Sequence, residues 1–262
     1  MTIDAGGDAS GEAAPVAESA QVTLPPIGAR FDYQLGGASP VPEGVTVVAR
    51  DSTEEPADGA YGICYVNGFQ TQPGATWPEE LLVRDDDGTL LVDANWPDEH
   101  VLDLSTSDNR AAIAARIGGT ITACAAAGYS AVEFDNLDSW TRSGGAFDAE
   151  ASADYATQLV ILAHRAGLAA AQKNTADLGS RGRDGIGFDF AVTEECDRFD
   201  ECTAYTDVYG ALVFDIEYTD DLRDTIAEVC GRTAQLVPGP SVIVRDRDLV
   251  AADADGYHYT AC

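Results

Sequence analysis

The feature that most constrains the fold of this chain is the alternation of short apolar runs with longer runs of helical spacing. Helical spacing at 109–127, 149–166 and 220–235 separates several of the apolar runs. Strands that alternate with helices form parallel sheets, and eight strands in 262 residues predict an α/β fold, a closed (β/α)8 barrel of the TIM type. The eight predicted strands lie at residues 29–37, 45–51, 62–67, 131–135, 168–173, 185–195, 210–218 and 241–246.

Two parts of the chain depart from a regular barrel. Residues 52–61 are too few for a crossover helix, which predicts a short or missing helix between strands 2 and 3. Residues 68–107 form a long connection that we expect to cover the barrel mouth, and it carries Phe69, Trp77 and Trp96. These rings either stack on a sugar or fill the core of the loop itself, and the sequence leaves both interpretations open.

We expect residues 25–262 to form a single domain and the protein to be a monomer. Residues 1–24 are small and acidic and contain no aromatic residue, a composition typical of a flexible leader, such as the start of a trimmed secreted protein or a lipoprotein tether. The sequence has no apolar run long enough for a membrane span and no basic-then-apolar signal pattern. It therefore predicts no membrane span.

The charge balance is strongly acidic. The chain has 15 Lys and Arg against 45 Asp and Glu, which gives a net charge of −30. Such a charge disfavours nucleic acid and anionic membranes as partners and favours cationic ligands. Lys173 is the sole lysine. Its position at the end of a predicted strand indicates either a functional role or an accident of a composition poor in lysine.

The six cysteines form an even set without a CxxC motif, and the three histidines are scattered. Disulfides in an oxidising compartment are therefore favoured over zinc, which predicts a secreted or cell-surface protein without a metal site. A lone GxG at 185–187 lacks the rest of a dinucleotide fingerprint, so we predict no cofactor. The predicted disulfides, in order of decreasing support, are Cys196–Cys202, Cys230–Cys262 and, by elimination, Cys64–Cys124.

The run 131–140, AVEFDNLDSW, concentrates carboxylates and an amide at the end of a predicted strand. Successive strand side chains alternate between two faces, so Glu133 and Asp135 share one face. An apolar strand followed by an acid, amide or lysine recurs in AAAQKN, FAVTEEC and LVFDIEYT. Because the carboxyl ends of barrel strands carry the active site, this recurrence predicts a functional rim there.

Six motifs together resemble a known family. The segments FDYQLGG, ICYVNGF, GYSAVEFDNLDSW, AQKN, AVTEECDRFDEC and FDIEYT resemble, in this order, the glycoside hydrolase family 114 domain of endo-α-1,4-polygalactosaminidases. The resemblance spans residues 31–247. It implies a (β/α)8 barrel and cleavage of α-1,4-linked galactosamine polymers.

The resemblance also implies roles for individual residues. The family's Glu-Pro-Asp-Asn motif falls on residues 133–136, with Phe134 in place of proline, so Asp135 matches the catalytic aspartate. The family's Asn-Glu-Gln-Cys motif falls on residues 193–196, where two positions differ, and Glu194 matches the catalytic glutamate. The residues predicted to bind substrate are Asp32, Tyr65, Glu133, Asn136, Lys173, Asn174, Glu217 and Tyr218.

Glycosidic cleavage generally uses two carboxylates, one protonated to donate to the leaving oxygen and one ionised. We expect Lys173 to keep Asp135 ionised, and Glu195 to push its neighbour Glu194 toward the protonated form. The sequence leaves retention and inversion open, and the predicted partner is a cationic or amino-sugar polysaccharide. The alternative is a noncatalytic extracellular carbohydrate-binding barrel protein, whose acidic mouth captures such a sugar or a divalent ion without cleaving anything.

Overall fold

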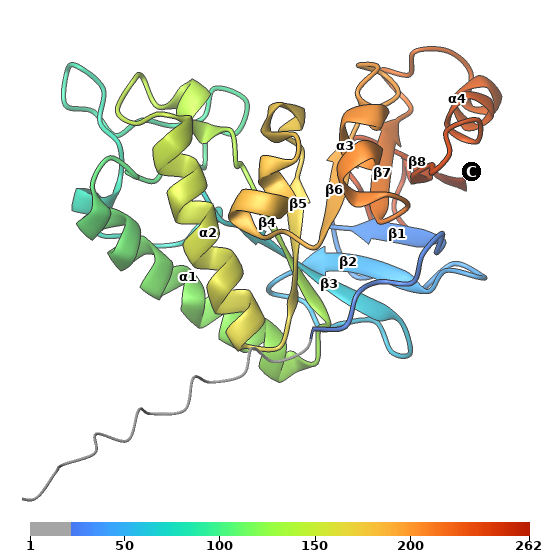
Figure 1. Ribbon diagram of the computed structural model, residues 1–262, viewed down its shortest axis with the longest axis horizontal. Helices are drawn as coiled ribbons and strands as arrows, with labels where there is room; N and C mark the ends of the chain where they lie inside the picture. The colour runs from blue at the N-terminus through green and yellow to red at the C-terminus, as the bar shows by residue number, and fades with distance from the viewer. Residues whose placement is uncertain (1–21) are drawn as a thin grey trace, which may run out of the picture.

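The computed structural model describes residues 22–262, whose strands form one nine-stranded sheet curled into a nearly closed barrel (Figure 1). Each strand pairs with the next in the chain, β1 to β8 in parallel and β9 antiparallel to β8. The predicted (β/α)8 barrel is confirmed, with β9 as an addition that the sequence pattern misses. The strands are β1 (Phe31–Gln34), β2 (Val47–Asp51), β3 (Tyr61–Asn67), β4 (Ala131–Asp135), β5 (Ala169–Lys173), β6 (Phe190–Glu194), β7 (Val213–Tyr218), β8 (Ser241–Arg245) and β9 (Tyr259–Ala261).

Helices cover the outer face of the barrel unevenly. The α-helices are α1 (Ser107–Ala127), α2 (Ala149–Arg165), α3 (Cys202–Tyr209) and α4 (Ile226–Thr233). The two long helices, α1 and α2, lie side by side (Figure 1). As predicted, the structure has no helix between β2 and β3; the described connection from β1 to β2 also lacks one. A short 3-10 helix, η3 (Ala176–Leu178), and a short π-helix, η4 (Gly182–Ile186), lie between β5 and β6.

Two helices differ from the sequence prediction. α3 is not predicted because most of its eight residues are β-branched or aromatic, which gives a weak helical signal. α4 begins at Ile226 rather than at residue 220, because the Thr225 side chain and Glu228 form a capping box that fixes the first turn there. The acidic stretch before Thr225 is therefore a connection rather than the start of the helix.

Side chains along each strand alternate between the barrel interior and the layer that faces the helices. Interior residues include Phe31, Phe190 and Phe214, whose rings meet edge to face at centroid distances of 5.2 Å and 6.0 Å. Alanines at 131, 169 and 171 share this interior cluster. The alternate positions of the same strands, such as Val132 and Phe134, pack toward the helices. The parity of a strand position thus decides whether its side chain faces the interior or the helices.

The seam between β1 and β8 is joined mainly by side chains. Arg245, which is buried, donates from Nη1 to Asp32 Oδ1 at 3.0 Å and to the carbonyl of Tyr33. The Gly36 amide donates to the Leu249 carbonyl at 3.2 Å. A Cβ at Gly36 would lie 2.6 Å from that carbonyl oxygen, so only glycine allows this approach.

All three predicted disulfides are present. Cys64 on β3 is bonded to Cys124 on α1, Cys196 to Cys202 at the start of α3, and Cys230 on α4 to Cys262. The first bond links the barrel to a long covering helix, and the second closes the loop that follows β6. Three bonds of this kind are typical of proteins that fold in an oxidising compartment.

The connection 68–107 lies at the barrel mouth, and its three aromatic rings differ in their surroundings. Phe69 is buried and meets Tyr155 of α2 edge to face at 5.0 Å. Trp77 is partly buried beneath the guanidinium of Arg116, 4.8 Å from its ring. Trp96, in contrast, is 64% exposed. Two of the rings therefore pack within the protein, and the third is available to a ligand.

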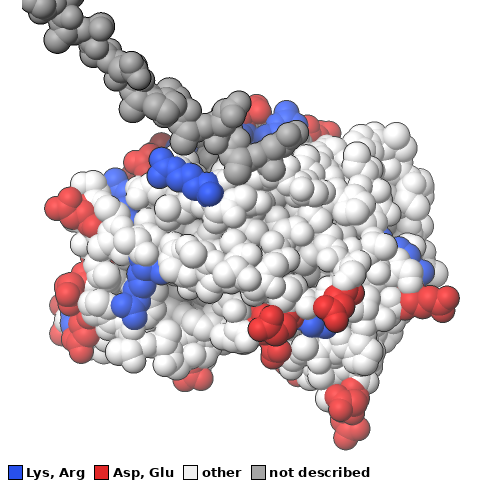
Figure 2. Space-filling view, turned by 90° about the horizontal axis from the view of Figure 1, so that it is seen from below, with Lys and Arg blue, Asp and Glu red and all other residues white. Residues whose placement is uncertain are grey.

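Most of the predicted leader lies outside the described residues. Of residues 22–24, Val22 packs against the interior cluster and the Thr23 carbonyl accepts a hydrogen bond from the Tyr61 hydroxyl at 2.7 Å. Within residues 22–262, no helix has both the length and the apolarity to cross a membrane. On the face shown in Figure 2, acidic side chains form several small groups interspersed with basic ones. On that face, the negative charge does not gather into one patch.

Candidate active site

The carboxyl ends of three neighbouring strands bring the predicted catalytic residues together. Glu133 and Asp135 are on β4, Lys173 ends β5 and Glu194 ends β6. Their side chains face the barrel interior, because each residue lies two or four positions after a residue of the interior cluster on the same strand. These cluster residues are Ala131 on β4, Ala171 on β5 and Val192 on β6. Since β4, β5 and β6 are adjacent in the sheet, the lysine lies between the two acidic strands.

Lys173 is the centre of this arrangement. Its side chain is 1% exposed, and Nζ lies 3.3 Å from Glu133 Oε1, 3.4 Å from Asp135 Oδ2 and 3.2 Å from Glu194 Oε2. Burial disfavours the charged form, but the three carboxylates outweigh it and raise the pKa of Lys173 well above its ordinary value. The prediction that Lys173 lies in the pocket, within ion-pair reach of Asp135 or Glu133, is confirmed.

Asp135 is 20% exposed and held by donors on both oxygens. The Tyr65 hydroxyl donates to Oδ2 at 2.8 Å and the Asn136 amide to Oδ1 at 2.7 Å. Asn136 adopts a positive φ of 64° and is fixed by its side-chain amide, which donates to Asn67 Oδ1 at 2.8 Å. The orientation of Asp135 is therefore determined by the protein before any ligand binds.

Glu194 is 27% exposed and accepts hydrogen bonds on both oxygens. Asn174 Nδ2 donates to Oε2 at 3.0 Å, and the Tyr218 hydroxyl donates to Oε1. Burial raises the pKa of Glu194, but the charge of Lys173 and the bonds from Tyr218 and Asn174 outweigh it, so the pKa is lowered.

The expected protonation of Glu194 by like-charge repulsion is wrong for the free protein. The sequence places Glu195 beside it, with a positive φ of 61°. Its carboxylate pairs with Arg247 at 3.0 Å instead. Lys173 is the charge that acts on Glu194, and it favours the ionised form.

Glu133 is predicted to bind substrate, but the structure places it beneath the pocket. Its side chain is fully buried, accepts a hydrogen bond from the Tyr33 hydroxyl at 2.5 Å and does not line the pocket. Burial raises the pKa of Glu133 to about 7, even though Lys173 and Tyr33 lower it. Its position suits electrostatic support of Lys173 rather than contact with a sugar.

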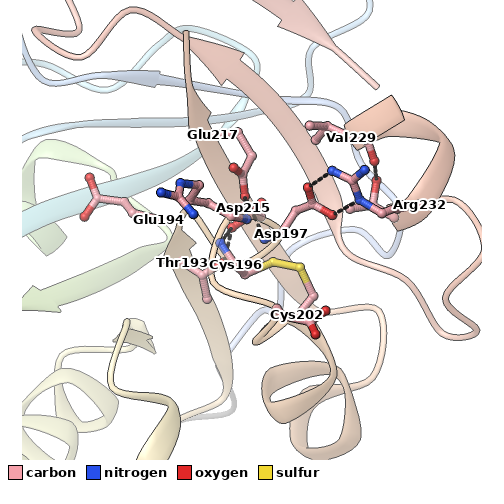
Figure 3. The surroundings of a disulfide bond; sticks show 12 residues. Thr193, Glu194, Cys196, Asp197, Cys202, Asp215, Glu217, Val229 and Arg232 are labelled. Atoms are coloured by element: carbon pink, nitrogen blue, oxygen red, sulfur yellow. Dashed lines mark hydrogen bonds and ion pairs between the residues drawn. A yellow bond between two sulfur atoms is a disulfide. The ribbon is translucent and has the colours of Figure 1, made fainter. Parts of the chain in front are cut away.

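Asp32 and Glu217, also predicted to bind substrate, lie outside the pocket. Asp32 pairs with Arg245 at the seam of the barrel. Glu217 Oε1 accepts a hydrogen bond of 2.7 Å from the backbone amide of Asp197 and so holds the loop after β6. Figure 3 shows Glu194 pointing away from Glu217, which lies near the disulfide. Both acids occupy strand positions of helix-facing parity, and this corrects the prediction.

A cleft of about 560 Å³ opens above the lysine, a volume suited to a small ligand or part of a polymer. Seven of the predicted residues line it: Tyr65, Asp135, Asn136, Lys173, Asn174, Glu194 and Tyr218. The lining residues that the sequence prediction misses come from connections, and they include Gln72, Asp93, Asn95, Glu99, Arg142, Arg247 and Asp248. Connections have no repeating pattern that relates sequence position to a face, so no signal in the sequence singles these residues out.

The described residues contain one group of three side chains close enough to hold a metal ion. It consists of Cys196, Cys202 and Asp215. Both cysteine sulfurs are bonded to each other in the disulfide, so they are not free thiolates and do not serve as metal ligands. In the cleft, the carboxylates of Asp135 and Glu194 already have an ammonium partner.

A parallel barrel whose strand ends present two partly exposed carboxylates in one cleft has the arrangement of a glycoside hydrolase active site. The chain belongs to glycoside-hydrolase family GH114, whose sequence model matches residues 11–262. The resemblance drawn from the six motifs is thereby confirmed. Comparison with curated protein sequences gives no significant match.

Solved structures support the same fold. Aspergillus fumigatus Ega3, crystallised with galactosamine, is 17% identical and superposes with a TM-score of 0.74 over 92% of this chain and 98% of that one. The glycoside hydrolase domain of PelA from Pseudomonas aeruginosa is 16% identical, with a TM-score of 0.55 over 84% of this chain and 95% of that domain. At these identities the similarity establishes the barrel fold.

Proposed function

We propose that this glycoside hydrolase cleaves α-1,4-linked, galactosamine-containing polysaccharide and that Asp135 and Glu194 are its catalytic carboxylates. The observation that carries the proposal is the placement of both carboxylates against one buried ammonium, that of Lys173, at the floor of a single cleft. The galactosamine bound to Ega3, a protein of similar fold, supports the choice of sugar. The net charge of −30 suits a polymer with free, cationic amino groups.

The separation of the two carboxylates favours a retaining mechanism. Asp135 Oδ2 and Glu194 Oε2 contact the same nitrogen at 3.4 Å and 3.2 Å, so their separation cannot exceed the sum of these two contacts. That sum is at the lower edge of the range of about 6.5–9.5 Å that inverting enzymes need to accommodate a water, whereas retaining pairs are roughly 5–5.5 Å apart. Asp135 then attacks the anomeric carbon and forms a glycosyl ester as the glycosidic C–O bond breaks, and Glu194 gives its proton to the leaving oxygen.

Each carboxylate has the surroundings that its role requires. Three donors, from Lys173, Tyr65 and the Asn136 amide, hold Asp135 as an oriented carboxylate for attack. Glu194 must be protonated in the first step and ionised in the second, when it takes a proton from water. A sugar that covers its exposed edge removes water and shifts Glu194 toward the protonated form.

The proposal includes an extracellular setting, either secreted or at the cell surface, which three disulfides support. A polysaccharide is a substrate that an exported enzyme meets outside the cell. We further propose that the enzyme acts as a monomer, because the cleft is completed by residues of one chain.

The test is release of reducing ends from de-N-acetylated α-1,4-galactosaminan in the presence of a chelator. Wild-type enzyme should produce new reducing ends, and Asp135→Asn and Glu194→Gln should each lower turnover by at least a thousandfold while the far-ultraviolet circular dichroism stays unchanged. Binding of the polymer without any new reducing ends would identify a noncatalytic carbohydrate-binding protein instead. Turnover by Asp135→Asn within tenfold of wild type would show that Asp135 is not catalytic.

A further inference from the structure

Most carboxylates that line the cleft have a basic partner, but Glu99 has none among residues 22–262. Arg142 pairs with Asp93 and Asp138, Lys173 pairs with Asp135 and Glu194, and Arg247 pairs with Glu195. Asp248 is also unpaired, but it is exposed to solvent at the rim. Glu99 is only 8% exposed, so it is a nearly buried carboxylate without a cation.

The geometry of Glu99 presents one oxygen to the cleft and fixes the other. Oε2 accepts hydrogen bonds from Asn67 Nδ2 at 2.7 Å and from Gln70 Nε2 at 3.0 Å. Oε1 accepts no hydrogen bond from the described residues and is not sealed from solvent. Two amides therefore orient a carboxylate whose remaining oxygen has no protein partner, and Glu99 lines the cleft.

The electrostatic surroundings of Glu99 disfavour its charge. Burial raises its pKa, the two amide bonds lower it, and Asp135 and Asp93 raise it again, with the net direction upward. A buried carboxylate that neighbours two other acids is costly unless a cation approaches. A structural role does not need this charge, because a neutral amide at the same position would accept the same two hydrogen bonds on its oxygen.

An exposed aromatic ring adjoins this carboxylate. Trp96 also lines the cleft and is 64% exposed. The Glu99 amide donates to the Trp96 carbonyl at 2.9 Å, so one tight turn fixes both residues. An exposed indole offers a flat apolar surface of the kind that packs against the C–H face of a sugar ring.

We propose that Trp96 and Glu99 form a subsite for one amino-sugar unit next to the bond that is cleaved. Trp96 packs against the sugar ring, and Glu99 Oε1 pairs with the ammonium group on that ring. The subsite selects free amino groups over N-acetylated ones, because an acetamide carries no charge to pair with the carboxylate. This inference rests on the proposed function, since it assumes that the cleft binds an amino-sugar polymer.

The test compares two ligands in a background that does not turn them over, Glu194→Gln. Isothermal titration uses an α-1,4-linked galactosamine tetrasaccharide and its fully N-acetylated counterpart. Glu99→Gln should raise the Kd of the amino tetrasaccharide by about tenfold to a hundredfold, the range of a charge-assisted hydrogen bond, and change that of the acetylated one by less than threefold. Asp98→Asn is the matched control, because Asp98 is an exposed acid of the same turn that does not line the cleft. It should change neither Kd more than threefold.

Trp96→Ala provides a second variant that does not depend on the buried site. Because Trp96 is exposed, its removal should leave the fold intact and weaken both tetrasaccharides by a similar factor of at least fivefold. The inference is overturned if Glu99→Gln weakens both ligands equally or neither, if Trp96→Ala leaves both affinities unchanged, or if neither tetrasaccharide binds. Selective loss in Glu99→Gln together with a wild-type enzyme that cleaves nothing would support the subsite and refute the proposed function.

Discussion

Replacement of Lys173 by methionine is the perturbation with the largest expected effect on the site. The substitution keeps a long, flexible side chain but removes the ammonium that contacts Glu133, Asp135 and Glu194. Lys173 is the leading cause that lowers the pKa of Glu194. Loss of a neighbouring opposite charge typically shifts a carboxyl pKa by about 1–3 units, and each unit corresponds to about 1.4 kcal/mol.

Two measurable consequences follow from this shift. The alkaline limb of the pH profile of kcat/KM should move upward by about 1–3 pH units, because Glu194, which must be protonated in the first step, then keeps its proton to a higher pH than in wild type. The free energy of unfolding should fall by about 3–5 kcal/mol at pH 8, the usual result of leaving a buried charge unpaired. The loss should be smaller at pH 5, since carboxyls with raised pKa values are then protonated in the folded state.

The assay is a pH–rate profile on de-N-acetylated galactosaminan, combined with urea unfolding at pH 5 and pH 8. Thr193→Val is a control, because Thr193 is also buried, on the neighbouring strand β6, but it faces the helices and its hydroxyl donates to Asp215 Oδ1 at 2.7 Å. The control should lose stability without moving the profile. A Lys173→Met enzyme with a wild-type profile would refute the idea that the lysine sets the charge state of the site.

Three further outcomes are expected. Tyr218→Phe removes a donor to Glu194 and should raise the pKa of that carboxyl, so the alkaline limb of kcat/KM should move upward by less than in the lysine variant; an unmoved limb would argue against this contact. Glu133 has a pKa of about 7 in the folded state, so the free energy of unfolding of wild type should fall by about 3 kcal/mol as the pH rises from 4.5 to 7 and the unfolded chain ionises first. Glu133→Gln should abolish this fall. Unfolding curves of both proteins across that range check it, and parallel pH dependence would contradict it. Replacing Cys64 and Cys124 together by alanine should cost about 4 kcal/mol, the value for a loop of 60 residues, and guanidinium unfolding showing a loss below 1 kcal/mol would exclude this contribution.

The strand pattern predicts the barrel well because parity and apolar runs are local properties. The same parity that groups Glu133 with Asp135 also places Asp32 and Glu217 on the helix-facing side. Their assignment as ligands of the substrate followed the family motifs instead of the alternation of their own strands. The alternation within β1 and β7 excludes both from the interior face.

The remaining differences arise from contacts that sequence position does not encode. The expected repulsion between Glu194 and Glu195 fails because Glu195 pairs with Arg247, which is distant in the sequence. Glu99 reaches the cleft through the turns of a long connection, where no period links position to orientation. α3 forms from residues of weak helical propensity, with its first residue in the Cys196–Cys202 disulfide.

The central claim is that Asp135 and Glu194, held around Lys173, cleave the polymer with retention. Proton NMR of the reaction on de-N-acetylated α-1,4-galactosaminan tests it most directly, because the anomer that appears first reports the stereochemistry before mutarotation. The close approach of the two carboxylates predicts that the α-anomer of the new reducing end appears first and the β-anomer grows in later. Initial formation of the β-anomer, or no new reducing ends from the wild-type enzyme, would contradict the account.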